Sequence, residues 1–222
     1  MNYPGGKGAI YQKLINLMPP HEIYIETHLG GGAVIRHKRP ASTNIGIEKD
    51  PRIIELWKNI DSLNFQLVHD DAYTFLRSYK FIGTELVYCD PPYLRSTRKS
   101  RKKKLYKYDY SYQEHIQLLK LLQSLPCKVM ISGYESDLYK EVLQGWNSHS
   151  FESVCHQGMG IEWVWMNYPP PVELHDYGYL GDTFRERERI KRKTNRWLAN
   201  LQNMPVLERQ ALLSALTTMN EL

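Results

Sequence analysis

A short stretch near the middle of the sequence combines an acid, two prolines and an aromatic ring after an apolar run. Residues 86–89 are Leu-Val-Tyr-Cys, and Asp90, Pro91, Pro92 and Tyr93 follow them. Because proline fixes φ and has no N–H, this loop offers a carboxylate and carbonyl oxygens rather than donors. Such acceptors suit an exocyclic amine like that of adenine, and Tyr93 adds a face on which a base could stack. A proline-stiffened turn after a core strand is the structural alternative.

Four strand-like segments of the chain end in acidic residues. The segments are 22–27, 44–48, 65–69 and 86–89, and the acids are Glu26, Glu48, Asp70 with Asp71, and Asp90. Ligands of open α/β sheets lie beyond the carboxyl ends of the parallel strands, so these acids are expected to converge at one edge. Each acid alone also has a structural explanation, because Asp and Glu stabilise the N-terminus of a helix that follows a strand.

A glycine turn follows the first of these strands. Gly30, Gly31 and Gly32 precede an apolar helical stretch, which is the junction at which α/β folds bind nucleotides. The turn lacks the Gly-Lys-Ser/Thr of a phosphate-binding loop and the full spacing of a dinucleotide-binding fingerprint. Glu48 follows the turn by about twenty residues, the distance at which a carboxylate accepts hydrogen bonds from an adenosine ribose.

Strands and helices alternate along the chain as far as residue 168. The expected helices span 10–18, 52–60, 72–79, 112–125 and 136–143, and a fifth strand spans 128–132. Residues 148–157 and 161–168 are expected to form an antiparallel hairpin joined through Gly158, Met159 and Gly160. The composition then becomes polar and charged, with later leucines at helical spacing, and acids alternate with bases over 185–189, which favours pairing within a helix. The sequence therefore predicts an α/β domain over 1–168 and a helical extension over 169–222.

Positive charge is concentrated in one loop of the sequence. Residues 95–107 contain eight Lys or Arg and no acid, so the remainder of the chain is net −3 while the whole chain is +5. A block of one sign is usually solvated unless it meets a polyanion. Because this block follows the acceptor loop and tyrosines stand at positions 106, 108, 110 and 112, within it and just after it, it favours contact with a nucleic acid. The DNA-contact candidates within 95–112 are Arg95, Arg98, Lys99, Arg101, Lys102, Lys103, Lys104 and Tyr108.

Several classes of protein fit the composition poorly. The three cysteines lie far apart without C-x-x-C spacing, which argues against a disulfide framework and against a metal site. No segment approaches the roughly 18 apolar residues of a membrane span, and the first residues do not resemble a signal peptide. We therefore expect a cytoplasmic protein without a metal or a membrane partner. The sequence leaves the oligomeric state open between a monomer and a weak dimer.

In their order along the chain, these motifs resemble the adenine-specific DNA amino-methyltransferases related to the Dam enzymes, the D12 class. The ordered set is Pro-Gly-Gly-Lys at 4–7, Glu26 with the glycine turn, Glu48, Asp71-Ala72, Asp90 to Tyr93 and the aromatic segment 163–168. The resemblance covers about residues 3–168. It implies a Rossmann-like methyltransferase fold with a seven-stranded, mostly parallel sheet and a C-terminal antiparallel hairpin. It also implies S-adenosylmethionine as cofactor and double-stranded DNA as partner.

The resemblance further implies which residues serve each part of the reaction. The cofactor residues would be Tyr3, Gly5, Gly6, Lys7, Glu26, Gly30, Gly31, Gly32, Glu48, Lys49, Asp71 and Ala72. Among them, residues 3–7 would lie along the methionine part, Glu48 would hold the ribose hydroxyls, and Asp71 would contact the cofactor adenine. The catalytic pocket for the target base would consist of Asp90, Pro91, Pro92 and Tyr93.

Two features depart from the family. Thr27-His28 stands where relatives usually have Pro-Phe, and we interpret His28 as a packing substitute rather than a catalytic base. The span from Asp71 to Leu86 holds about one helix, whereas Dam-like enzymes insert their target-recognition domain there. Recognition of a DNA sequence is therefore assigned to another part of the chain.

The expected activity is methylation of the N6 amine of an adenine flipped out of duplex DNA. Methylation of a cytosine N4 amine, an RNA amine or a protein glutamine amide uses related chemistry and stays open. A non-catalytic DNA-binding regulator also stays open, although the intact acids and glycines oppose it. Cytosine ring methylation needs a nucleophilic Cys, and Cys127 precedes a strand without an acidic partner, so it is rejected. No Tyr-x-x-x-Lys motif supports a nicotinamide-dependent oxidoreductase.

Overall fold

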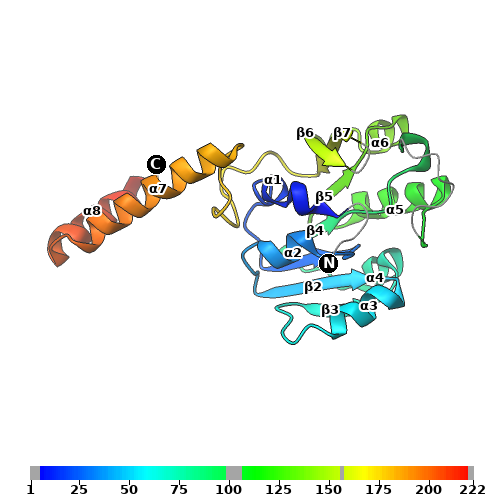
Figure 1. The fold of residues 1–222 in the computed structure, drawn as a ribbon, viewed down its shortest axis with the longest axis horizontal. Coiled ribbons are helices and arrows are strands. Elements are labelled where there is room, and N and C mark those ends of the chain that lie inside the picture. The colour runs from blue at the N-terminus through cyan, green and yellow to red at the C-terminus, as the bar shows by residue number, and fades with distance from the viewer. Residues whose placement is uncertain (1–5, 99–106, 156–157, 220–222) are drawn as a thin grey trace. The chain divides into compact units, whose positions relative to one another are not determined.

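The computed structural model describes residues 6–98, 107–155 and 158–219, and the chain divides into two compact units, Met1–Asp176 and Tyr177–Leu222. The first unit contains one sheet of seven strands in the order β3-β2-β1-β4-β5-β7-β6 (Figure 1). The strands are β1 (Ile23–Glu26), β2 (Thr43–Glu48), β3 (Gln66–His69), β4 (Glu85–Cys89), β5 (Lys128–Gly133), β6 (Asn147–Cys155) and β7 (Gly158–Met166). Neighbours are parallel except around β7, which runs antiparallel to β5 and β6. This topology confirms the predicted methyltransferase fold.

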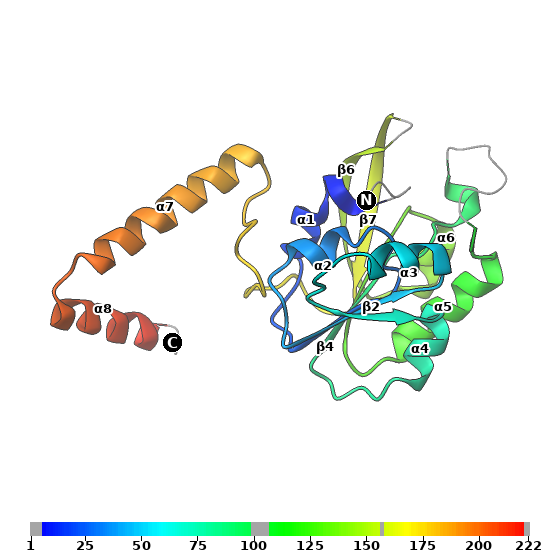
Figure 2. The same cartoon turned by 60° about the horizontal axis from the view of Figure 1, so that its bottom comes forward.

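Helices cover both faces of the sheet. Because β-α-β crossovers are right-handed, the reversal of strand order after β1 places the helices before and after that reversal on opposite faces. Figure 2 shows α1 and α2 on one side and α5 and α6 on the other. The central strand β4 is buried at every residue, which explains its unbroken apolar run. The helices of the first unit are η1 (Lys7–Ala9), α1 (Tyr11–Ile15), α2 (Ala33–His37), α3 (Pro51–Lys58), α4 (Ala72–Ser78), η2 (Arg95–Thr97), α5 (Tyr112–Ser124) and α6 (Asp137–Val142).

Polar residues that follow a strand cap the N-termini of α3 and α4. Asp50 precedes α3 and accepts a hydrogen bond from the Arg52 N–H at 3.0 Å. Asp71 precedes α4 and accepts from the N–H groups of Tyr73 and Thr74. Side-chain oxygens at this position satisfy N–H groups that have no partner within the helix. The structural explanation of Asp71 therefore holds, and it is compatible with a second role in a site.

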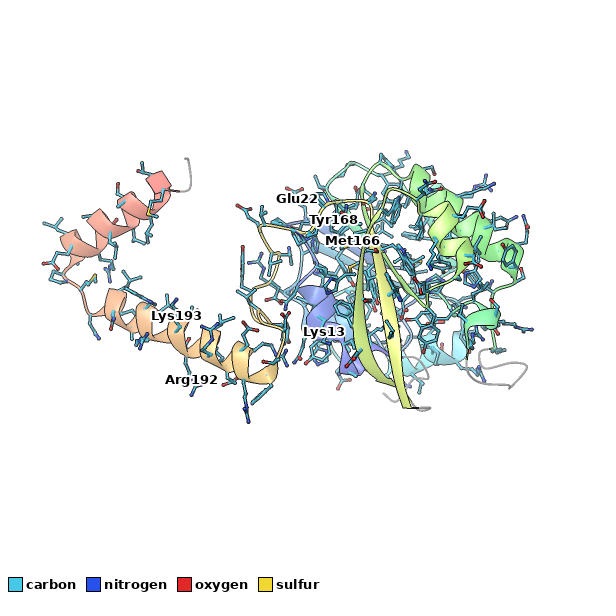
Figure 3. All side chains as sticks on the ribbon, turned by 90° about the horizontal axis from the view of Figure 1, so that it is seen from above. Lys13, Glu22, Met166, Tyr168, Arg192 and Lys193 are labelled. Atoms are coloured by element: carbon cyan, nitrogen blue, oxygen red, sulfur yellow. The ribbon has the colours of Figure 1, made fainter. Side chains whose placement is uncertain are left out.

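The C-terminal hairpin of the first unit differs from its prediction at the connection. β7 begins at Gly158, so Gly158, Met159 and Gly160, which were expected to join the two strands, belong to β7 itself. Figure 3 shows β6 and β7 side by side, with Met166 at the end of β7. Since β7 runs against β5, its early residues lie near the carboxyl end of β5, and the register pairs Trp163 with Gly133. The residue before Trp163 is thereby brought to the edge where the parallel strands end.

The second unit contains two helices, α7 (Phe184–Gln202) and α8 (Val206–Met219), in agreement with the helical extension predicted there. Thr183 caps α7 by accepting a hydrogen bond from the Glu186 N–H at 3.2 Å. Glu186 also lies 3.6 Å from Arg189, an ion pair of the kind expected within this helix. Figure 3 shows Arg192 and Lys193 projecting from α7. No helix in the described part of the chain is long and apolar enough to cross a bilayer.

Candidate active site

A cleft opens at the carboxyl ends of the strands, beside the point between β1 and β4 where the strand order reverses. The cleft is open to solvent, and the empty space in it amounts to about 910 Å³ when the adjoining open space is counted. The predicted residues that line it are Gly6, Lys7, Glu26, Gly30, Gly31, Gly32, Glu48, Lys49, Asp71, Ala72, Asp90, Pro91, Pro92, Tyr93 and Tyr108. Four of the strand-end acids therefore converge as expected. Asp70, the alternative to Asp71, is half-buried and is not among the residues that line the cleft.

The glycine turn forms the floor of the cleft under tight steric limits. Gly30 and Gly32 have positive φ angles of 46° and 59°, a conformation that favours glycine. A Cβ on Gly32 would lie 2.6 Å from the buried Trp57 ring. Trp57 in turn donates its indole N–H to the Gly30 carbonyl at 2.9 Å. The Trp57 ring packs against the turn and fixes its backbone, and the absence of side chains on the glycines lets a ligand in the cleft approach that backbone closely.

Glu48 lies at the end of β2 and supports the glycine turn. One carboxylate oxygen accepts a hydrogen bond from the Gly30 N–H at 2.9 Å, and the other accepts from the Asp50 N–H at 2.8 Å. Burial raises the pKa of Glu48, while these N–H donors oppose the rise. A carboxylate has about four acceptor positions, and the Lys49 N–H adds to these two donors, so at least one position stays available for a donor of a ligand. This acceptor capacity in a buried cleft fits a hydroxyl of a ribose.

Asp71 and Lys49 form an ion pair along one side of the cleft. The Lys49 ammonium lies 2.9 Å from the Asp71 carboxylate, and both side chains are partly exposed. Burial raises the pKa of Asp71, but the hydrogen bonds from Lys49 and from the first N–H groups of α4 outweigh it and hold the pKa below its usual value. Lys107 and Tyr108 also line the cleft here, and the Lys49 ammonium lies 5.8 Å from the centre of the Tyr108 ring. Tyr108 is thus beside the candidate cofactor region.

Glu26 and His28 are hydrogen-bonded within the protein. Glu26 accepts from the Tyr24 hydroxyl at 3.0 Å and from the Ile35 N–H at 2.9 Å, and burial raises its pKa to about 8. His28 contacts the Thr27 hydroxyl at 2.8 Å and the Tyr110 hydroxyl at 3.0 Å. Burial lowers the pKa of His28 to about 3, so the ring is neutral. These contacts favour the interpretation of His28 as a packing residue.

Asp90 follows β4 and contacts a buried lysine. The Lys7 ammonium lies 2.6 Å from the Asp90 carboxylate and is itself only 6% exposed. Burial raises the pKa of Asp90 to about 6, while Lys7 opposes this rise and Glu162 adds to it. Burial alone would lower the pKa of Lys7, but Asp90 and Glu162 outweigh it and raise that pKa above its usual range. Lys7 is therefore charged and lies beside the acceptor loop; its expected role along the cofactor stays a prediction.

Tyr93 is held by residues that the sequence did not single out. Its hydroxyl donates a short hydrogen bond to Glu162 of β7, and its ring packs edge-on against Tyr134 with centroids 4.6 Å apart. The Lys7 ammonium lies 4.8 Å from the centre of the same ring. Glu162 also lies 3.0 Å from the Lys7 ammonium. These contacts connect four residues into one cluster at the acceptor loop, namely Lys7, Asp90, Tyr93 and Glu162.

The basic loop is described only at its ends. Arg95 and Arg98 both pair with Asp109, and the Arg98 side chain is 8% exposed, so in the structure this arginine joins the two ends of the loop. Lys99, Arg101, Lys102, Lys103 and Lys104 lie outside the described residues, as do Tyr3 and Gly5 of the N-terminal motif. Their expected contacts with DNA and with the cofactor stay predictions.

Several residues of the site were not predicted from the sequence, among them Asp50, Lys107 and Tyr110, which line the cleft, and Glu162 and Tyr134, which contact Tyr93. A signal was available for Asp50, since it follows Glu48 at the same strand end. No local signal marked Glu162, because a single acid in an alternating strand is typical of a solvent-facing position.

Comparison with known families places this cleft in a chemical context. Residues 52–157, just under half of the chain, match the family model of the D12 class N6 adenine-specific DNA methyltransferases. This match confirms the resemblance drawn from the motifs and supports an S-adenosylmethionine-dependent methyltransferase. A sequence comparison with curated proteins gives no match.

Solved structures with a similar chain path are distant in sequence. They include an rRNA methylase from Streptococcus thermophilus, 12% identical over 71% of this chain and 93% of that one, with a TM-score of 0.47. The N-methyltransferase NodS from Bradyrhizobium japonicum WM9 is 8% identical over 72% and 94%, with a TM-score of 0.48. The O-methyltransferase TomG from Streptomyces achromogenes, solved with SAM, is 13% identical over 72% and 78%, with a TM-score of 0.47. Since these scores lie below 0.5, the fold assignment depends on the sheet topology itself.

Proposed function

From the D12 match over residues 52–157, we propose that the protein methylates the N6 amine of adenine in duplex DNA with S-adenosylmethionine as methyl donor. The observation that carries this proposal is the arrangement at the strand ends, where an acceptor loop with a buried carboxylate adjoins a cleft with ribose-type acceptors. The DNA adenine substrate itself is supported by the family match.

The cleft residues fit S-adenosylmethionine. Glu48 would accept hydrogen bonds from the ribose hydroxyls, the glycine turn would let the backbone approach the ligand, and Asp71 with Ala72 would face the adenine of the cofactor. When bound, the cofactor supplies a methyl group on a sulfonium, and the sulfur keeps the bonding electron pair as the new N–C bond forms.

The acceptor loop would prepare the amine for attack. An aromatic amine is a weak nucleophile because its lone pair is delocalised into the ring. Hydrogen bonds from its two N–H groups to the Asp90 carboxylate and the Pro91 carbonyl would favour a pyramidal nitrogen and hold it in line with the methyl group. The nitrogen then has to lose one proton, for which Asp90 is a nearby acceptor. No covalent intermediate with the protein is required.

The target adenine has to leave the duplex to reach this loop, at a cost of a few kcal/mol. Stacking on Tyr93 would return roughly 1–3 kcal/mol of that cost. The basic loop 95–107 follows the acceptor loop directly, so we assign the phosphate contacts to its lysines and arginines, Lys102, Lys103 and Lys104 among them. Since Arg98 is paired with Asp109, it would orient the loop rather than contact DNA.

A labelled-methyl assay tests the proposal. The protein is incubated with S-adenosylmethionine carrying a labelled methyl group and with mixed-sequence duplex DNA, and the DNA is digested to nucleosides. We expect label in N6-methyladenine, and none with the Asp90→Ala variant. Label in N4-methylcytosine, or label in RNA or protein only, would replace the adenine substrate by one of the alternatives. Cofactor-independent DNA binding without any transfer would favour a non-catalytic regulator.

A further inference from the structure

Glu162 connects the C-terminal hairpin to the acceptor loop. It lies on β7, is 6% exposed, and one of its carboxylate oxygens contacts both the Lys7 ammonium at 3.0 Å and the Tyr93 hydroxyl. Asp90 contacts the same ammonium at 2.6 Å. Lys7 is therefore shared between two buried carboxylates, one from the end of β4 and one from β7.

Such a shared cation needs an explanation. A buried charge costs several kcal/mol unless it is paired, and one carboxylate would be enough to pair Lys7. With two carboxylates and one ammonium, the cluster carries an additional negative charge in a buried place. This arrangement is costly for folding, so a purely structural role explains it poorly.

We propose that Glu162 is a positioning residue of the methyl transfer, which fixes Tyr93 for stacking and divides the charge of Lys7 so that Asp90 stays a strong acceptor. This inference rests on the proposed function. With Glu162 in place, Lys7 is held from both sides and cannot pair with Asp90 alone. The Asp90 carboxylate consequently keeps more negative charge for the N–H groups of an incoming amine. The hydrogen bond from Tyr93 to Glu162 at the same time holds the ring beside the loop.

The electrostatic part of this role has a definite sign. Glu162 raises the pKa of Asp90, and Lys7 lowers it. Other titratable groups around Asp90 are Glu26 of β1, Tyr88 and Cys89 of β4, Tyr93 of the loop and Tyr139 of α6. The Tyr93 hydroxyl interacts with both Glu162 and Asp90 and lowers the pKa of Asp90, so a stronger bond from Tyr93 to Asp90 in Glu162→Gln would act in the same direction as the loss of the Glu162 charge. Removing the charge of Glu162 should therefore lower the pKa of Asp90, and removing the charge of Lys7 should raise it.

The geometry bounds the size of the change. Because both carboxylate oxygens contact one ammonium, at 2.6 and 3.0 Å, they are at most 5.6 Å apart. Two unit charges at that separation shift a pKa by about half a unit even at the dielectric constant of water, and by more in a buried site. We expect Glu162→Gln, which has nearly the same shape, to lower the pKa of Asp90 by at least about half a unit.

The pKa of Asp90 can be read without turnover. In protein labelled with ¹³C at the aspartate carboxyl carbons, the Asp90 signal is the one that disappears in Asp90→Asn, and its shift is followed from pH 4 to 9. Glu162→Gln should titrate at lower pH than the parent, Lys7→Gln at higher pH, and Glu162→Asp close to the parent. Glu152→Gln on β6 is the matched control, because Glu152 is an exposed acid of the same hairpin. Cofactor affinity and thermal melting of Glu162→Gln confirm that it is folded.

Single-turnover methylation supplies the second readout. If Asp90 must be ionised, the rate falls as pH drops through about 6 in the parent, and this limb moves to lower pH in Glu162→Gln. The plateau rate should also fall, because Lys7 then pairs with Asp90 alone and weakens it as an acceptor. An unchanged Asp90 titration in Glu162→Gln overturns the inference, as does a rate reduced equally at every pH. A parent that transfers no methyl group to DNA refutes the proposed function instead.

Discussion

The replacement of Glu48 by alanine tests the cofactor site most directly. Glu48 is buried at the end of β2, and its two carboxylate oxygens accept the N–H groups of Gly30 and Asp50 at 2.9 and 2.8 Å. The proposed ribose hydroxyls would use its remaining lone pairs. A hydrogen bond to a charged group contributes about 1.5–3 kcal/mol, which corresponds to a roughly 10- to 150-fold change in a dissociation constant. We therefore expect Glu48→Ala to weaken S-adenosylmethionine binding by about that factor.

The same substitution also removes support from the glycine turn. It leaves two N–H groups without their acceptor, at a cost of about 1–3 kcal/mol each in the free energy of unfolding. Calorimetry has to separate this effect from the loss of a direct contact. An analogue of the cofactor that lacks the ribose hydroxyls should bind the parent more weakly than the natural cofactor. Glu48→Ala should bind the two ligands almost equally, because paired contacts are not additive.

Glu55→Ala is the control for this experiment, since Glu55 is an exposed acid of α3 that pairs only with Lys58 in the described contacts. It should leave both affinities near the parental values. If Glu48→Ala discriminates between the cofactor and the analogue as strongly as the parent does, Glu48 does not contact the ribose.

Three further predictions concern the reaction and the DNA. Asp90→Ala should abolish methyl transfer while S-adenosylmethionine still binds, as measured by single-turnover assay and calorimetry; near-normal turnover would remove Asp90 from its role as amine acceptor. Tyr93→Ala should lower both the transfer rate and the fluorescence change of a base analogue at the target position, and an unchanged fluorescence response would argue against stacking. If about six charges of loop 95–107 contact phosphates, DNA affinity should fall on the order of a thousandfold between 50 and 200 mM salt. Replacing Lys102, Lys103 and Lys104 by alanine should then flatten the dependence of log affinity on log salt by about three units at most. Deleting the helical extension should affect stability or assembly more than this slope, and the opposite result would transfer the phosphate contacts to the extension.

The sequence alone determined the alternation of strands and helices and the ends at which chemistry could occur. Apolar runs that stop at Glu26, Glu48 and Asp90 define parallel strands, since each pattern is complete within a few neighbouring residues. The positive φ angles of Gly30 and Gly32 are also a local property, because glycine adopts such angles without steric cost and its positions can be read from the sequence. For parallel strands, moreover, the carboxyl ends share one edge by topology, so the convergence of the acids followed without coordinates.

The tertiary structure decided which groups meet within that edge and how strongly they ionise. Glu162 reaches Lys7 and Tyr93 only because β7 runs antiparallel to β5 with Trp163 opposite Gly133, and a shift of one residue would turn its side chain to the other face. Lys7 lies more than 80 positions before Asp90 in the sequence, so its 2.6 Å contact with Asp90 depends on the packing of η1 against α1 and α2. The pKa of Asp90 near 6 follows from burial and from these two distant charges. Residue type and spacing can name a candidate acid, but its protonation depends on desolvation and on neighbours that only the folded chain supplies.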